Sequence, residues 1–106
     1  MSYRFMRTIV MFDLPSTTND DLREYRKFRK FLISSGFMML QESIYCKLIF
    51  NATAQMSLLS NIRKNKPKNG IVQVLTITEK QYGSMEFIIG ESTSTLIDND
   101  ERLVIL

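Results

Sequence analysis

The sequence of 106 residues contains no histidine and no tryptophan, and it has a single cysteine, Cys46. Without histidine, the chain cannot form a Ser–His–Asp triad, an imidazole general base or a His-ligated zinc site. With one cysteine, it cannot form an internal disulfide or a multi-cysteine zinc site. Any chemistry must therefore use carboxylates, hydroxyls, lysines or a hard cation with oxygen ligands, such as Mg²⁺.

Long hydrophobic runs are also missing. The first residues mix charged side chains with a short apolar run, and no stretch approaches the roughly 20 apolar residues of a membrane span. No secretory signal is visible, so we expect a cytoplasmic protein with no membrane segment. A chain of this length suits one domain with a single core.

Charge is distributed unevenly along the chain. Residues 1–70 carry 12 Lys and Arg against 5 Asp and Glu, whereas residues 71–106 carry 2 against 6. A basic body indicates an anionic partner such as a nucleic acid, and the acidic C-terminal part indicates a separate role.

The predicted order of elements is β-α-β-β-α-β, followed by two further strands. Continuous or alternating apolar runs predict the strands, and apolar residues at helical spacing predict the helices. The strands are expected at 5–13, 37–41, 43–50, 70–78, 85–90 and 102–106, and the helices at 20–35 and 53–65. The first six elements match the α+β, ferredoxin-like plan, in which two helices cover one face of a sheet.

The two C-terminal strands have no obvious position in a four-stranded ferredoxin-like sheet. We therefore distinguish a ferredoxin-like core, residues 1–78, from C-terminal strands and an acidic tail, residues 79–106, within one domain. Strands that lack a pairing position in their own subunit often pair with a sheet edge of another subunit. A homodimer is expected, with this C-terminal part docking the second copy or another partner.

Asp13 is the candidate metal ligand. It follows the apolar run Ile9–Phe12 and precedes Leu14 and Pro15. On spacing alone, an acid in Asp-x-Pro is typical of the end of a strand and the start of a turn. The alternative is a metal or phosphate site at the carboxyl end of the strand. One carboxylate makes a poor magnesium site, but a two-fold axis would supply a second copy of Asp13.

The predicted helix at 20–35 is strongly amphipathic. Tyr25, Phe28 and Leu32 share its apolar face, and four basic residues occupy the opposite face. Like charges three and four residues apart repel one another, and a phosphate backbone would relieve this repulsion. The alternative is an ordinary solvated helix face. Arg29 falls near the apolar side, so we expect it to form a structural pairing. The candidate nucleic-acid-binding residues are Arg23, Arg26, Lys27 and Lys30, with Arg63 and Lys64 in a second, looser basic stretch that continues to Lys66 and Lys68.

Several stretches together resemble one protein family. They are Asp13-Leu14-Pro15 after the apolar strand, the helical segment YRKFRKFL, Gln41-x-Ser43-Ile44-Tyr45 after Gly36, and the C-terminal segments TEKQYGSMEFIIGE and NDERLVIL. The chain resembles the small CRISPR-associated adaptation proteins, the Cas2 family, in the version found in type II systems.

The resemblance implies a ferredoxin-like homodimer placed between dimers of the larger CRISPR integrase subunit. In such complexes the larger subunit performs the transesterification, and the small dimer holds prespacer duplex DNA by its phosphates during spacer acquisition. The resemblance also implies an alternative, because family members are described as magnesium-dependent endonucleases that act on RNA or DNA. The acid matching Asp13 is there the catalytic metal ligand. A small-molecule-binding regulatory domain remains a third class, because a fold does not determine a function.

Overall fold

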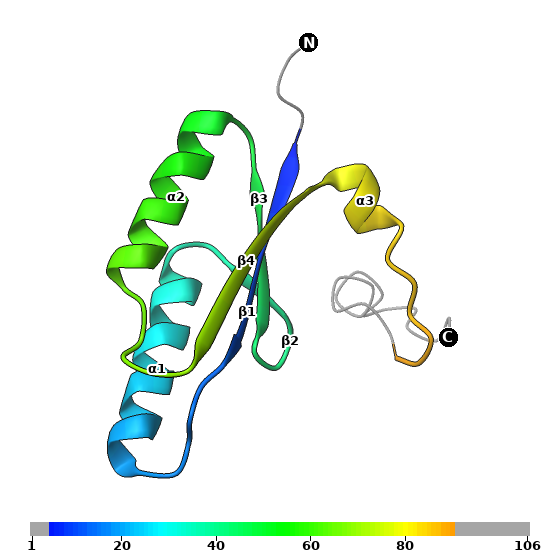
Figure 1. Cartoon of the computed structure of the whole chain (residues 1–106). Helices are drawn as coiled ribbons and strands as arrows, with labels where there is room; N and C mark the ends of the chain where they lie inside the picture. The colour runs from blue at the N-terminus through cyan, green and yellow to red at the C-terminus, as the bar shows by residue number, and fades with distance from the viewer. Residues whose placement is uncertain (1–4, 91–106) are drawn as a thin grey trace.

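The computed structural model describes residues 5–90, which form a four-stranded antiparallel sheet with two long helices on one face (Figure 1). The elements are β1 (Met6–Asp13), α1 (Asn19–Ser34), β2 (Met38–Gln41), β3 (Ile44–Ile49), α2 (Ala52–Lys64), β4 (Ile71–Thr78) and α3 (Glu79–Gly83). The strand order β2-β3-β1-β4 places β3 and β1 at the centre of the sheet. The predicted α+β, ferredoxin-like plan is confirmed.

The core lies between the sheet and the two helices α1 and α2. Val10 and Phe12 of β1 are buried on this side. Because side chains alternate along a strand, Thr8 also faces the helices, whereas Arg7 and Ile9 face the opposite side, which we call the open face. The other buried members of the core cluster are Phe28, Leu32, Phe37, Tyr45, Ile49, Leu58 and Ile62.

One group of polar side chains connects α2 to the two strands beneath it. Thr8 is fully buried, and its hydroxyl donates to Gln55 Oε1 at 2.8 Å. Gln55 Nε2 in turn donates to Thr76 Oγ1 at 2.7 Å, and Thr76 lies directly opposite Thr8 in the β1–β4 register. Since buried polar groups are costly without partners, this network fixes the position of α2 over β1 and β4.

The start of α1 is set by a capping box. The Thr18 hydroxyl accepts from the Asp21 N–H at 3.0 Å, and Asp21 Oδ2 accepts from the Thr18 N–H at 3.1 Å. Two N–H groups at the start of the helix thereby gain partners, and the carboxylate also lies favourably at the positive end of the helix dipole. The capping box therefore fixes the start of α1 at Thr18.

Helix α3 is attached to the open face, on the side of the sheet away from α1 and α2 (Figure 1). The Arg7 guanidinium stacks on the Tyr82 ring, 4.4 Å from the ring centroid, and Arg7 Nε donates to Glu79 Oε1 at 3.0 Å. Burial lowers the pKa of Arg7, but hydrogen bonds with Glu79 and Cys46 outweigh burial and raise it. Arg7 therefore stays charged and holds both Glu79 and Tyr82 of α3 against β1.

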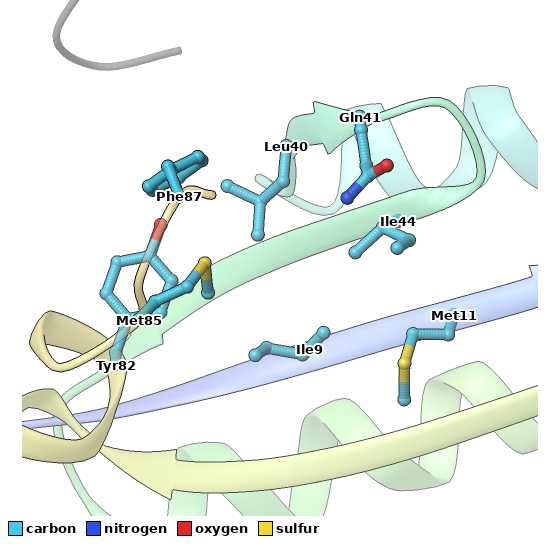
Figure 2. A pocket seen from close by; sticks show the side chains of 8 residues that line it. All are labelled: Ile9, Met11, Leu40, Gln41, Ile44, Tyr82, Met85 and Phe87. Atoms are coloured by element: carbon cyan, nitrogen blue, oxygen red, sulfur yellow. The ribbon is translucent and has the colours of Figure 1, made fainter. Parts of the chain in front are cut away.

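The prediction of a strand at residues 85–90 is wrong. This segment is irregular, and it crosses the open face after α3 instead of pairing with the free edge of β4. Met85 and Phe87 line an apolar pocket with Ile9 and Leu40 (Figure 2). Met85 and Phe87 thus lie against the sheet face without strand pairing, whereas Ile88 and Ile89 are 83% and 91% exposed. The predicted strand at residues 102–106 lies outside the described residues.

Gly70 offers a test of how tightly the start of β4 packs against the end of β1. Its φ is +99°, and a Cβ there would lie 2.7 Å from the Asp13 carbonyl oxygen and 2.8 Å from Leu14 Cδ2. Gly36 has a similar φ of +95°, but a Cβ there would meet only the flexible end of Lys47. Gly36→Ala therefore serves as the matched control.

We expect Gly36→Ala to lower the free energy of unfolding by about 1–2 kcal/mol, because left-handed backbone disfavours a Cβ. Gly70→Ala should lower it by about 1–3 kcal/mol more, because backbone atoms must also move. Urea unfolding followed by circular dichroism measures both values. Equal losses for the two variants would contradict the close contact between Gly70 and Asp13.

Candidate nucleic-acid interface and carboxylate pocket

The outer face of α1 carries four exposed cations, which we call the basic face: Arg23, Arg26, Lys27 and Lys30. They face outward because Phe28 and Leu32, on the opposite side of the helix, are buried against the sheet. Arg23 forms an ion pair with Asp20, and both side chains are more than half exposed. Within residues 5–90, the other three cations form no ion pair, so their charges remain available to an anion.

Arg29 does not form the structural pairing that its position in the sequence predicts. Its side chain is exposed, and it has no hydrogen bond or ion pair with any residue of the described range 5–90. It follows Arg26 by three residues and therefore adds a charge at the margin of the basic face.

The two predicted basic stretches meet at one point in the fold. Lys27 of α1 and Lys64 at the end of α2 line the same hollow, of about 70 Å³, together with Glu24 and Lys66. Arg63 is also exposed, but it lies about 100° around α2 from Lys64 and does not line the hollow. The structure thus brings Lys64 to the basic face and leaves Arg63 apart from it.

Asp13 lies exposed at the end of β1, where it lines an open pocket that we call the carboxylate pocket. Glu42 and Ser43 from the turn between β2 and β3 line the same pocket. The turn is held there because the Phe12 N–H donates to the Ser43 carbonyl at 3.1 Å, and Ser43 adopts a left-handed φ of 67°. Two carboxylates of one protomer therefore face a shared, solvent-accessible space.

The carboxylate oxygens of this pocket are ligands of the type that Mg²⁺ binds in proteins. Mg²⁺ binds carboxylates, keeps several waters and often completes its coordination with substrate phosphates. The described part of the chain holds no cluster of three or more Cys, Asp or Glu side chains that could bind a metal. Asp13 and Glu42 would therefore hold the ion only with the help of water, a substrate phosphate or a second copy of the chain.

Sequence reasoning missed Glu42 as a residue of the Asp13 pocket, and it missed that Lys66 of the second basic stretch lies beside Lys27. Glu42 becomes a neighbour of Asp13 only through the antiparallel pairing of β1 with β3, which places the β2–β3 turn at the end of β1. Lys66 follows α2 in a loop that the sequence alone does not place near α1. The ferredoxin-like plan was the one feature of the sequence that could have indicated the approach of Lys66 to α1, because it places two helices side by side on one face of the sheet.

Comparison with known proteins identifies the family. Residues 6–85 match the family model described as CRISPR associated protein Cas2. The chain belongs to the Cas2 family. Two curated relatives carry the name CRISPR-associated endoribonuclease Cas2. The protein from Treponema denticola is 54% identical over 101 residues, which cover 95% of this chain and 100% of the relative. The protein from Streptococcus mutans is 45% identical over 95% of this chain and 93% of the relative.

A solved structure titled "Crystal structure of cas2" supports the fold. It aligns with 85% of this Cas2 chain and with 92% of its own length, with a TM-score of 0.57 and 15% sequence identity. The family assignment places the chain among the proteins of CRISPR adaptation. In residues 5–90, none of the helices combines the length and the hydrophobicity that crossing a membrane requires.

Proposed function

We propose that this Cas2 protein is a dimeric scaffold for CRISPR spacer acquisition in the cytoplasm. It binds the phosphate backbone of prespacer duplex DNA alongside the larger integrase subunit. The observation that carries the proposal is the basic face of α1, where Arg26, Lys27 and Lys30 have no ion pair within the described residues. Phosphate contacts give affinity without reading base sequence, which suits a protein that must accept DNA of any sequence.

The open face supports the dimeric part of the proposal. Ile71 and Leu75 of β4 are 58% and 50% exposed, and Met38 of β2 is 44% exposed. Leu75 and Met38 lie opposite Ile9 and Cys46 in the register, and opposed residues of an antiparallel pair share a face. A second copy packed on the open face would remove this apolar surface from water and leave both basic faces outside.

Charge reversal on the basic face tests the scaffold. Arg26→Glu/Lys30→Glu should weaken the binding of duplex DNA roughly tenfold or more at about 0.1 M salt, because two phosphate contacts become repulsive. The slope of the logarithm of the binding constant against the logarithm of salt concentration should fall by about 2. Fluorescence anisotropy with duplexes of unrelated sequence measures both quantities.

Lys80→Glu, on α3, and Arg26→Glu form a matched pair of single reversals on opposite sides of the sheet. The reversal on α1 should weaken binding more strongly than the reversal on α3. Unchanged binding by the double variant at moderate salt would show that the basic face is not the DNA interface. In cells, spacer acquisition should fall in parallel with duplex affinity.

A charge placed on the open face tests the dimer. Leu75→Glu should shift the protein toward the monomer, because a carboxylate would be buried in an apolar interface without a partner. Met56→Glu, on α2 at a side chain that is 71% exposed, is the control and should leave the dimer intact. Sedimentation velocity over a range of protein concentrations gives the result. A wild-type protein that is monomeric throughout would contradict the dimeric scaffold.

A second candidate function is metal-dependent cleavage of nucleic acid, with RNA as the first substrate to test. The carboxylate pocket favours it, because Asp13 and Glu42 of one protomer line the same space. A bound Mg²⁺ would polarise a phosphate and lower the pKa of its bound water. Asp13 and Glu42 would hold the ion, but the chain has no histidine to act as a general acid or base. We therefore favour the scaffold.

Removal of the Asp13 carboxylate tests this second function. Asp13→Asn should abolish any Mg²⁺-dependent cleavage of single-stranded RNA, and Glu42→Gln should reduce it, because each variant removes one anionic ligand. Glu86→Gln, outside the carboxylate pocket, should have no effect. Gel assays on rigorously purified protein measure cleavage. Cleavage that persists in Asp13→Asn would assign the activity to another site or to a contaminant.

A further inference from the structure

The hollow between α1 and the end of α2 gathers cations from two separate parts of the sequence. Lys27 comes from α1, Lys64 from the last turn of α2, and Lys66 from the loop that follows. All three side chains are exposed, and within residues 5–90 none of them forms an ion pair. Three cations and one carboxylate, Glu24, line a space of about 70 Å³, so the charge of the lining is net positive.

The helix dipole accounts for the position of only one of the three lysines. A cation in the last turn of a helix interacts favourably with the negative end of the helix dipole, and this accounts for Lys64 without any ligand. Lys27 lies in the middle of α1, and Lys66 lies beyond α2, so neither gains in this way. Their convergence on Lys64 costs like-charge repulsion, which an anion in the hollow would relieve.

Glu24 also lines the hollow, but its carboxylate is engaged by the loop. Glu24 Oε1 accepts from the backbone N–H of Lys68 at 3.3 Å. This contact joins α1 to the loop after α2 and keeps Lys66 beside Lys27. Pro67, which is partly buried and also lines the hollow, restricts the backbone of the same loop.

We propose that the hollow is a seat for one phosphate group of the bound duplex, with Lys27, Lys64 and Lys66 as its ligands and Glu24 as a positioning residue. The inference rests on the proposed scaffold function and adds a specific contact to it. Lys27 belongs to both the basic face and the hollow, so a backbone that follows α1 reaches the seat directly. The ligand is a phosphodiester, for which lysine ammonium groups serve as point charges.

Neutralising single lysines of the same loop tests the seat. Lys66→Gln should weaken duplex binding about three- to fivefold at about 0.1 M salt and lower the salt slope by about 0.9, as expected for one lost phosphate contact. Lys68→Gln is the matched control, because it changes the same charge in the same loop without altering a residue that lines the hollow. Equal effects of the two substitutions would overturn the seat and indicate diffuse attraction only.

Two substitutions of Glu24 test its positioning role. For Glu24→Ala, the lost charge predicts tighter duplex binding, whereas the lost contact with the loop predicts weaker duplex binding. Both Glu24→Gln and Glu24→Ala remove a negative charge near DNA, so charge alone predicts tighter binding by both. Glu24→Gln keeps an oxygen that accepts from the Lys68 N–H, whereas Glu24→Ala releases the loop. We expect tighter or unchanged binding with Gln and about twofold or greater weakening with Ala. Tighter binding by both variants would overturn the positioning role.

The same titrations separate the seat from the scaffold. If Arg26→Glu/Lys30→Glu loses duplex binding while Lys27→Gln/Lys64→Gln/Lys66→Gln retains it, the seat is wrong and the scaffold stands. If neither variant loses binding, the scaffold itself is wrong. Circular dichroism and thermal unfolding of each variant show whether it folds, and Lys66→Gln, at an exposed loop position, is expected to fold like the wild type.

Discussion

The pairing of β1 with two neighbours is the constraint on which the rest of the structure depends. β1 pairs with β3 on one side and with β4 along its whole length on the other. Every second side chain of β1 therefore enters the core beneath α1 and α2, and the others form the centre of the open face. The same pairing brings the β2–β3 turn to the end of β1, where Glu42 joins Asp13. One strand thus positions the core, the open face and the carboxylate pocket together.

The sheet separates two surfaces of opposite character. Cations cover the outer side of α1, whereas the open face exposes apolar side chains such as Ile71 and Leu75. Electrostatic attraction to a polyanion and burial of apolar area therefore act on different sides of a thin molecule and do not compete for the same residues. Arg7 also points to the open face, and its charge is neutralised locally by Glu79.

The sequence predicts those features that depend on local patterns. The sequence alone predicts the apolar run of β1, the amphipathic period of α1 and the four basic residues opposite the buried face of α1. Residues 85–90 show the limit, because a short apolar segment has the same composition whether it pairs as a strand or lies irregularly over a sheet face with much of its surface exposed. The pairing of Glu42 with Asp13 and the approach of Lys66 to Lys27 could not be predicted either, since these residues become neighbours only when the sheet and the helical layer form.

The loop between α2 and β4 has a consequence for how the protein can evolve. It carries Lys66 at one end and Gly70 at the other, and Gly70 packs directly on the backbone of Asp13. An inserted or deleted residue would displace the lysine from α1 and force Gly70 away from the end of β1. The loop can therefore tolerate changes of side chain at its exposed positions far more readily than any change in its length.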